Sequence, residues 1–186
     1  MAGKLRERGG LVIVDEAFAD VAPKSSLVPY VDEENLIVLR SIGKFYGLAG
    51  LRLGFAIGAN RRLQPLRELM GEWAVSGPAL HVGQRALADK AWQKQTLQVL
   101  TRQATAHRDV FKKCSTKVVG GTLLFHLIEV ADARTLHHQL AKRAIWTRRF
   151  DQDPHWLRVG LCKNPVELKH FETELQEALR AVEMAA

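Results

Sequence analysis

The chain has 186 residues, of which 47% are hydrophobic and 25% are charged, and this composition excludes a disordered or collagen-like protein. Its 27 Lys and Arg residues exceed its 20 Asp and Glu residues, giving a net charge of +7. Because the basic residues are dispersed along the chain, nucleic-acid binding has little support, whereas phosphorylated or carboxylated small molecules suit the charge.

The length predicts one ordinary domain or two small ones. No apolar run approaches the ~20 residues that span a bilayer, and the charged N-terminus does not resemble a secretory signal. The two cysteines, Cys114 and Cys162, form no disulfide or zinc pattern, and the seven histidines lack metal-ligand spacing. We therefore expect a cytoplasmic protein without a membrane span and without a bound metal.

The first half of the chain alternates apolar segments with loops and then becomes helical. Residues 4–8 resemble the tail of a helix that Gly9 and Gly10 stop. Continuous apolar character predicts three parallel strands of a mainly parallel sheet, buried on both faces, at residues 11–14, 35–39 and 51–59. Helical segments are expected at 60–70, with Asn60 as its cap, and from Gly77-Pro78 to about Lys113, continuous or broken.

The second half has the character of a smaller α+β unit. We expect a strand or hairpin at 117–130, interrupted by Gly120-Gly121, a helix at 131–144, and short strands at 145–148 and 157–161. Asn164, Pro165 and Glu167 form the start signal of a last helix. The pattern predicts an α/β protein with a large-domain portion over 1–91 and a small C-terminal domain over 92–186. Three strands make a poor core for a sheet buried on both faces, so we expect the later portion of a larger protein.

Three features between residues 15 and 54 combine into one candidate site. Asp15 ends a buried strand, where open α/β sheets place their ligands. Ser41-Ile42-Gly43-Lys44 ends the next strand, and a glycine-dense run from Gly47 to Gly54 carries Arg52. Taken singly, such residues are usually a turn aspartate, a solvated lysine and a turn-forming loop.

Together these residues predict a pyridoxal-phosphate site. We expect Lys44 to be desolvated between two buried strands, which would lower the pKa of its amine and suit it to a Schiff base. Ser41 and Arg52 can donate to a phosphate, and Asp15 can pair with a protonated ring nitrogen. These groups are the parts that pyridoxal phosphate requires.

The run Asp15-Glu16-Ala17-Phe18, followed by Ser41-x-x-Lys44-x-x-Gly47-x-x-Gly50-x-Arg52-x-Gly54, resembles the signature of fold-type-I pyridoxal-phosphate enzymes. The resemblance is closest to the histidinol-phosphate aminotransferase branch of the class I/II aminotransferases. It implies that Lys44 holds the cofactor and shuttles a proton, Asp15 binds the ring nitrogen, and Ser41 and Arg52 bind the phosphate. It also implies a homodimer in the full-length protein.

Within that branch, the chain resembles the threonine-phosphate decarboxylases of cobalamin biosynthesis, on the runs 15–20, 43–55 and 146–150. Histidinol-phosphate aminotransferases usually carry Tyr where Phe18 stands, and Phe cannot supply that hydroxyl. The resemblance implies decarboxylation of L-threonine O-3-phosphate to aminopropanol phosphate. An aminotransferase of the histidinol-phosphate type and a non-catalytic remnant stay open as alternatives.

Two arginines near the C-terminus are the candidate substrate-binding residues. Arg158, in Trp156-Leu157-Arg158-Val159-Gly160, matches the position where the family binds the substrate carboxylate. Arg148 matches a second arginine near the substrate in members that handle phosphate. A guanidinium binds a carboxylate through two parallel hydrogen bonds, which lysine cannot do.

Overall fold

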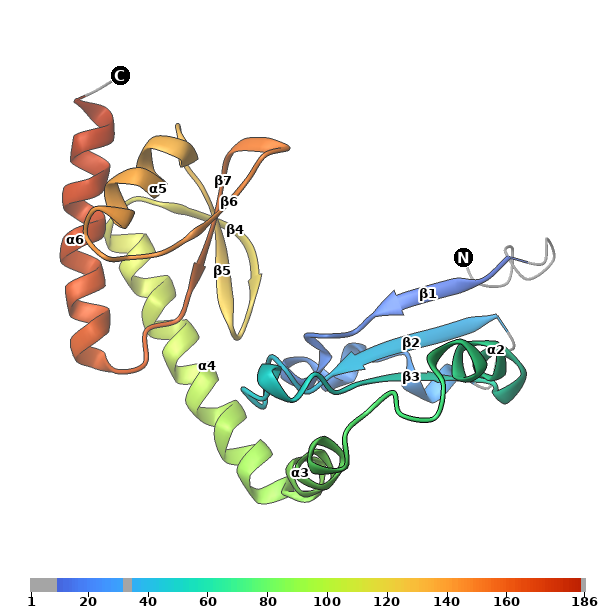
Figure 1. The fold of residues 1–186 in the computed structure, drawn as a ribbon. Coiled ribbons are helices and arrows are strands. Elements are labelled where there is room, and N and C mark those ends of the chain that lie inside the picture. Colours follow the sequence, from blue (N-terminus) through green and yellow to red (C-terminus); the bar gives the residue numbers. More distant parts are fainter. Residues whose placement is uncertain (1–9, 32–34, 185–186) are drawn as a thin grey trace. The chain divides into compact units, whose positions relative to one another are not determined.

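The computed structural model describes residues 10–31 and 35–184 of the chain (Figure 1). Two compact units divide it, and their boundary falls between Trp92 and Gln93. The helix tail expected at 4–8 lies outside the described residues. Among the helices of the described ranges, none is both long enough and apolar enough to cross a bilayer.

The first unit contains a three-stranded sheet in the order β1-β2-β3. Its strands are β1 (Val12–Asp15), β2 (Leu36–Ser41) and β3 (Gly54–Gly58). β1 and β2 are parallel, with Asp15 beside Leu39, so the carboxyl ends of both strands lie at the same edge of the sheet. Short 3-10 turns at Ala19–Val21, Pro23–Ser25 and Val28–Tyr30 follow β1.

The prediction of a third parallel strand is wrong, because β3 is antiparallel to β2, with Ser41 opposite Gly54. A parallel neighbour requires a crossover that carries the chain back along the whole strand. The connection 42–53 instead closes on itself, since the Leu48 N–H donates to the Ile42 carbonyl at 3.2 Å. Its regular structure is the short 3-10 turn Ala49–Leu51, so the chain re-enters the sheet at the edge where it left.

Burial of the first strand on both faces is also a wrong prediction. Ile13 is 59% exposed, while Val12 and Val14, on the other face, are half-buried. Within the described residues, β1 is one of the two edge strands of this sheet, and β2 is its neighbour. The fully buried character expected from its sequence is found instead in the central strand β2, whose Leu36, Ile37 and Val38 are buried.

Three helices follow the sheet: α2 (Asn60–Met70), α3 (Gly77–Ala88) and α4 (Lys90–Lys113). The expected stretch after Gly77-Pro78 is therefore broken, at Asp89. Ser76 caps α3, where its hydroxyl accepts a hydrogen bond from the Ala79 N–H at 3.4 Å. Ala59 occupies the N-cap of α2, so Asn60 is not the cap that we expected but the first helical residue. Asn60 Oδ1 accepts instead from the Arg67 guanidinium.

The second unit is an antiparallel sheet in the order β4-β5-β7-β6, accompanied by most of α4 and by two further helices, α5 and α6 (Figure 1). Its elements are β4 (Lys117–Thr122), β5 (Phe125–Glu129), α5 (Ala133–Ala141), β6 (Arg148–Phe150), β7 (Asp153–Gly160) and α6 (Pro165–Glu183). One apolar core joins the sheet to α5, α6 and the end of α4, and its fully buried members include Phe111, Ile128, Leu136, Leu157 and Leu175. The helical spacing of apolar residues in α6 is what brings Phe171 and Leu175 into that core.

The expected hairpin forms, but Gly120-Gly121 does not interrupt it. Both glycines lie within β4, where a register shift between Val118 and Gly120 marks a bulge, and the turn falls at Leu123-Leu124. The predicted start of the last helix is confirmed, because Asn164 Oδ1 accepts from the Glu167 N–H at 2.9 Å. The strand expected at 145–148 begins later, at Arg148, and the strand expected at 157–161 begins earlier, at Asp153.

The core of the second unit contains the buried histidine His107, and we therefore expect the stability of this unit to depend on pH. His107 is buried, its Nε2 accepts a hydrogen bond from the Cys162 N–H at 2.7 Å, and burial lowers its pKa to about 4. The unfolded chain, with an ordinary histidine pKa near ~6.5, binds this proton first. The free energy of unfolding should thus be highest above pH ~6.5 and fall by roughly 2–4 kcal/mol as the pH drops towards ~4.

Urea unfolding between pH 7 and pH 4 measures this slope. His107→Gln keeps an acceptor but does not titrate, so it should flatten the dependence, whereas the exposed His170, changed to Gln, serves as the control. The remaining slope in His107→Gln is expected from His126, whose pKa burial also lowers. An identical slope in His107→Gln and in the unchanged protein would contradict the prediction.

Candidate functional site

A loop at the carboxyl end of β2 gathers three of the predicted site residues. Ser41, Lys44 and Arg52 line one cavity of about 220 Å³, together with Gly43, Leu48, Ala49, Leu53 and Gly54. The cavity thus presents a hydroxyl, an ammonium and a guanidinium beside small side chains. This donor set is suited to a phosphate ester.

Buried apolar side chains hold the loop in place. Ile42, Phe45 and Leu53 are 2%, 6% and 6% exposed, and they anchor the loop on either side of Lys44. Leu53 packs directly against Gly83 of α3, where a larger residue would not fit, because an added Cβ would lie 2.3 Å from Leu53 Cδ2. The loop therefore has a fixed apolar side and a polar side that carries Lys44 and Arg52.

The expected desolvation of Lys44 is not found, because Lys44 is exposed in this structure. The residues that the strands bury are its neighbours Ile42 and Phe45, so the lysine lies on the open side of the loop. Its ammonium lies 5.9 Å from the centre of the Phe18 ring. Phe18, which stands where the histidinol-phosphate aminotransferases usually carry Tyr, is thus the aromatic residue beside Lys44.

Asp15 ends β1 at the same sheet edge, but it is not among the residues that line the Ser41–Arg52 cavity. Its carboxylate Oδ1 accepts a hydrogen bond from the Ala17 N–H at 2.9 Å, which fixes the turn that follows the strand. Asp15 is exposed and lies on the face of the sheet that carries Ile13. Its carboxylate therefore remains available to a ligand on that open face.

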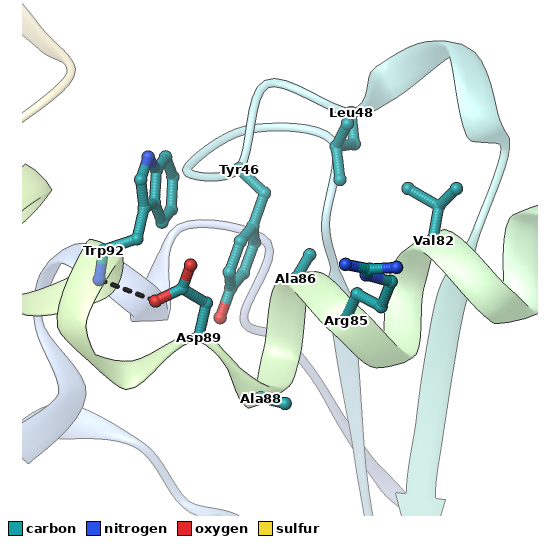
Figure 2. Close-up of a pocket in the computed structure, with 8 residues that line it drawn as sticks. All are labelled: Tyr46, Leu48, Val82, Arg85, Ala86, Ala88, Asp89 and Trp92. Carbon is teal, nitrogen blue, oxygen red and sulfur yellow. Dashed lines mark hydrogen bonds between the residues drawn. The ribbon is translucent and has the colours of Figure 1, made fainter.

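A second, larger cavity of about 790 Å³ borders the same loop (Figure 2). Figure 2 shows Tyr46 and Leu48 of the loop facing Val82, Arg85 and Ala86 of α3. The Tyr46 and Trp92 rings stack with centroids 5.7 Å apart. Asp89 Oδ1 accepts from the Trp92 N–H at 2.9 Å and so caps α4. The aromatic residues fasten the loop that holds Lys44 to the break between α3 and α4.

Sequence reasoning missed the charged cluster beneath this edge. Arg40, one residue before Ser41, pairs with Glu16 at 3.2 Å and with Asp20 at 2.6 Å. The signal was present in the sequence, because a charged residue that ends an apolar strand needs a partner when it is half-buried. In the sequence, Glu16 and Asp20 were considered only as members of the motif and were not assigned a partner.

The two candidate substrate residues lie in the second unit, on neighbouring strands. Arg148 of β6 pairs in register with Arg158 of β7, so both side chains leave the same face of the sheet. The Arg158 guanidinium lies 5.0 Å from the centre of the Phe125 ring. In the described part of the chain, no carboxylate forms an ion pair with either arginine, whereas the adjacent Arg149 contacts Asp151.

Like charges directly opposite one another destabilise a sheet. Since neither Arg148 nor Arg158 pairs with a carboxylate in the described part of the chain, their two positive charges form an uncompensated cationic patch. Such a patch suits a ligand that carries one or two anionic groups.

The glycines of the loop allow a test of its geometry. Gly47 has φ +69°, a left-handed conformation that costs a residue with a Cβ about 1 kcal/mol. Gly47→Ala should lower the free energy of unfolding by that amount and speed amide exchange at Leu48, whose N–H closes the loop. Gly50→Ala is the matched control, because an added Cβ meets nothing within 4 Å at either glycine and Gly50 does not have a positive φ. Equal effects of the two substitutions would contradict the described loop.

The chain matches the profile of the family described as aminotransferase class I and II over residues 1–175. It is 44% identical over 158 residues to a threonine-phosphate decarboxylase of Pseudomonas aeruginosa, covering 85% of this chain and 47% of the relative. It is 38% identical over 185 residues to a threonine-phosphate decarboxylase of Sinorhizobium sp., covering 99% and 54%. A histidinol-phosphate aminotransferase of Nostoc sp. is 31% identical over 148 residues, covering 78% and 42%.

Solved structures agree on the fold. The histidinol-phosphate aminotransferase of Sinorhizobium meliloti, solved in complex with pyridoxal-5'-phosphate, superposes with a TM-score of 0.83 at 20% identity. That likeness covers 92% of this chain and 49% of the other. The chain spans about half the length of the curated relatives that it matches.

Proposed function

This chain belongs to the aminotransferase class I and II family, and on that premise we propose that it carries the pyridoxal-phosphate site of a threonine-phosphate decarboxylase. The cavity that joins Ser41, Lys44 and Arg52 is the observation that carries the proposal. The two relatives with that name are more similar in sequence to this chain than the aminotransferase from Nostoc.

The residues of the first unit fit the cofactor. Ser41 Oγ and the Arg52 guanidinium would hold its phosphate, and the Asp15 carboxylate would pair with its ring nitrogen. Gly54 lets the strand pass close to β2, since an added Cβ would lie 3.1 Å from the Arg40 carbonyl oxygen. The Lys44 amine would bind the cofactor covalently. When bound, pyridoxal phosphate withdraws electrons from the bonds of the substrate's α-carbon.

In the proposed reaction, L-threonine O-3-phosphate loses its carboxylate as carbon dioxide, and the α-carbon gains a proton. Lys44 would deliver that proton once the substrate amine has displaced it. Arg158 would bind the substrate carboxylate through two hydrogen bonds, and Arg148 would take a second anionic group of the substrate. The uncompensated charge of the two arginines supports this pairing with a doubly anionic substrate.

The runner-up function is amino transfer on a histidinol-phosphate-type substrate. The two reactions differ in which bond of the α-carbon is broken: the bond to the carboxylate in one and the bond to hydrogen in the other. Phe18, beside Lys44, favours the decarboxylase, because the aminotransferases usually carry a tyrosine there. A non-catalytic chain that keeps this fold is the third possibility, and it would not bind the cofactor.

We also propose a cytoplasmic enzyme that forms a homodimer when full length. Both cysteines, Cys114 and Cys162, are free and half-buried, which suits a reducing compartment. The exposed apolar residues Leu69 and Met70 at the end of α2, and Trp73 in the turn after it, support association with another surface. Sedimentation of the full-length protein would measure its oligomeric state.

Lys44 is expected to be the residue that binds the cofactor covalently. Borohydride reduction of the protein with pyridoxal phosphate, followed by peptide mapping, should place the adduct on Lys44. Lys44→Ala should lose the adduct, whereas the exposed Lys24, changed to Ala, should keep it. An adduct at another lysine, with Lys44 unmodified, would refute the assignment.

Arg158 is expected to bind the substrate carboxylate. Arg158→Lys should keep cofactor binding but lower kcat/KM for carbon dioxide release from threonine phosphate, by roughly 2–4 kcal/mol of transition-state binding. The cause is the loss of the paired hydrogen bonds, since lysine presents a point charge. Arg149→Lys, on the neighbouring strand β6 and paired in register with Leu157, should leave the kinetics unchanged. Unchanged kinetics in Arg158→Lys would remove Arg158 from the site.

A further inference from the structure

A partly buried ion-pair cluster of Glu16, Asp20 and Arg40, to which the Ser26 hydroxyl adds a hydrogen bond, lies where β1 and β2 end. The Arg40 guanidinium reaches both acids, through Nη1 to Glu16 Oε2 at 3.2 Å and through Nη2 to Asp20 Oδ1 at 2.6 Å. Glu16 is 6% exposed and also accepts hydrogen bonds from the Ser26 hydroxyl at 2.7 Å and the Leu27 N–H at 2.5 Å. One guanidinium thus compensates the buried carboxylate of Glu16 and the largely buried carboxylate of Asp20.

Because side chains alternate between the faces of the sheet, this cluster lies on the face opposite to Asp15 and Ser41. Successive side chains of a strand point to opposite faces, so Asp15 and Glu16 diverge, and so do Arg40 and Ser41. Because Asp15 lies beside Leu39 in the parallel register, Glu16 and Arg40 meet on one face. Asp15 and Ser41 lie on the other face, where the proposed function places the cofactor.

The cluster also reaches the loop that holds Lys44. Tyr46, two residues after Lys44, has its pKa raised by burial and by the Asp20 charge, while the Arg40 charge opposes that shift. The Tyr46 ring in turn stacks on Trp92, and its centroid lies 5.1 Å from that of the Phe45 ring in a T-shaped arrangement. The Arg40 cluster therefore joins the residue after Asp15 to the residue before Ser41 by direct contacts, and its charges lie near Tyr46 of the loop that carries Lys44.

Buried ion pairs of this kind contribute little to net stability, because desolvation offsets their attraction. Removing one partner is costly, however, since the charges that remain are buried and uncompensated. Without Arg40, two carboxylates would repel one another at the point where β1, β2 and the turns after β1 converge. The local geometry, more than the fold of the whole unit, depends on this residue.

We propose that Arg40 is a positioning residue, which fixes the Asp15 turn and the Ser41–Lys44 loop relative to each other from the opposite face of the sheet. Two hydrogen bonds report that geometry: Ala17 N–H to Asp15 Oδ1 at 2.9 Å and Gly43 N–H to Ser41 Oγ at 3.1 Å. This positioning is a property of the protein without cofactor. Its consequence for the cofactor rests on the proposed function.

The first measurement uses the protein without cofactor. Hydrogen–deuterium exchange should be about tenfold or more faster at the amides of Ala17, Leu27 and Gly43 in Arg40→Gln. Asp20→Asn removes one ion pair and should give a smaller increase at the same amides, which keeps the test valid if Arg40→Gln does not fold. Arg143→Gln is the matched control, because it breaks a half-buried pair with Glu174 in the second unit. Unchanged exchange at these three amides in both variants of the cluster would overturn the proposal.

The second measurement titrates the same proteins with pyridoxal phosphate and records the pH dependence of the visible absorbance band. Arg40→Gln should raise the Kd by about tenfold or more and shift the pH profile, because Asp15 and Lys44 no longer hold their relative positions. Arg40→Lys should give an intermediate Kd, since one ammonium can pair with only one acid at a time. Arg143→Gln should lower stability without a change in either property.

The two measurements separate the two claims. If the unchanged protein binds no pyridoxal phosphate, the proposed function fails, while amide exchange still decides the role of Arg40. If it binds the cofactor and Arg40→Gln has the same Kd and pH profile, Arg40 does not position the site. Faster exchange together with weaker binding, and a partial recovery in Arg40→Lys, is the result that the proposal predicts.

Discussion

The parallel pairing of β1 with β2 is the constraint on which the candidate site depends. It brings the carboxyl ends of the two strands to one edge of the sheet, with Asp15 beside Leu39 and Ser41 two residues further. The alternation of the pleat then sorts the polar residues at that edge between its two faces. The candidate ligand-binding residues Asp15 and Ser41 lie on one face, and the ion pairs of Arg40 with Glu16 and Asp20 lie on the other.

The loop after β2 shows how a short segment can be both anchored and chemically open. Its buried residues Ile42, Phe45 and Leu53 fix the backbone, while Lys44 and Arg52 extend from the polar side. The second unit uses a different device, two arginines in register on adjacent strands of an antiparallel sheet. In both places the position of a cation follows from neighbours that are apolar or held by backbone hydrogen bonds.

Local signals in the sequence predicted much of the fold, and non-local contacts account for the errors. The cap at Asn164, the three apolar segments of the first unit and the grouping of Ser41, Lys44 and Arg52 depend on adjacent residues, and these predictions hold. The direction of β3 depends on how the loop 42–53 closes, and the exposure of Ile13 depends on which strand lies at the edge. Neither is encoded in local periodicity. Lys44 was expected to be buried because its neighbours are apolar, but those neighbours take the buried positions themselves.

The central claim is that one sheet edge of this chain forms a pyridoxal-phosphate site. A crystal structure of the protein grown with pyridoxal phosphate tests it most directly. The account predicts a phosphate within hydrogen-bond distance of Ser41 Oγ and the Arg52 guanidinium, continuous density to Lys44 Nζ, and the ring nitrogen beside Asp15. Cofactor bound elsewhere, or a ring nitrogen without a contact to Asp15, would contradict it.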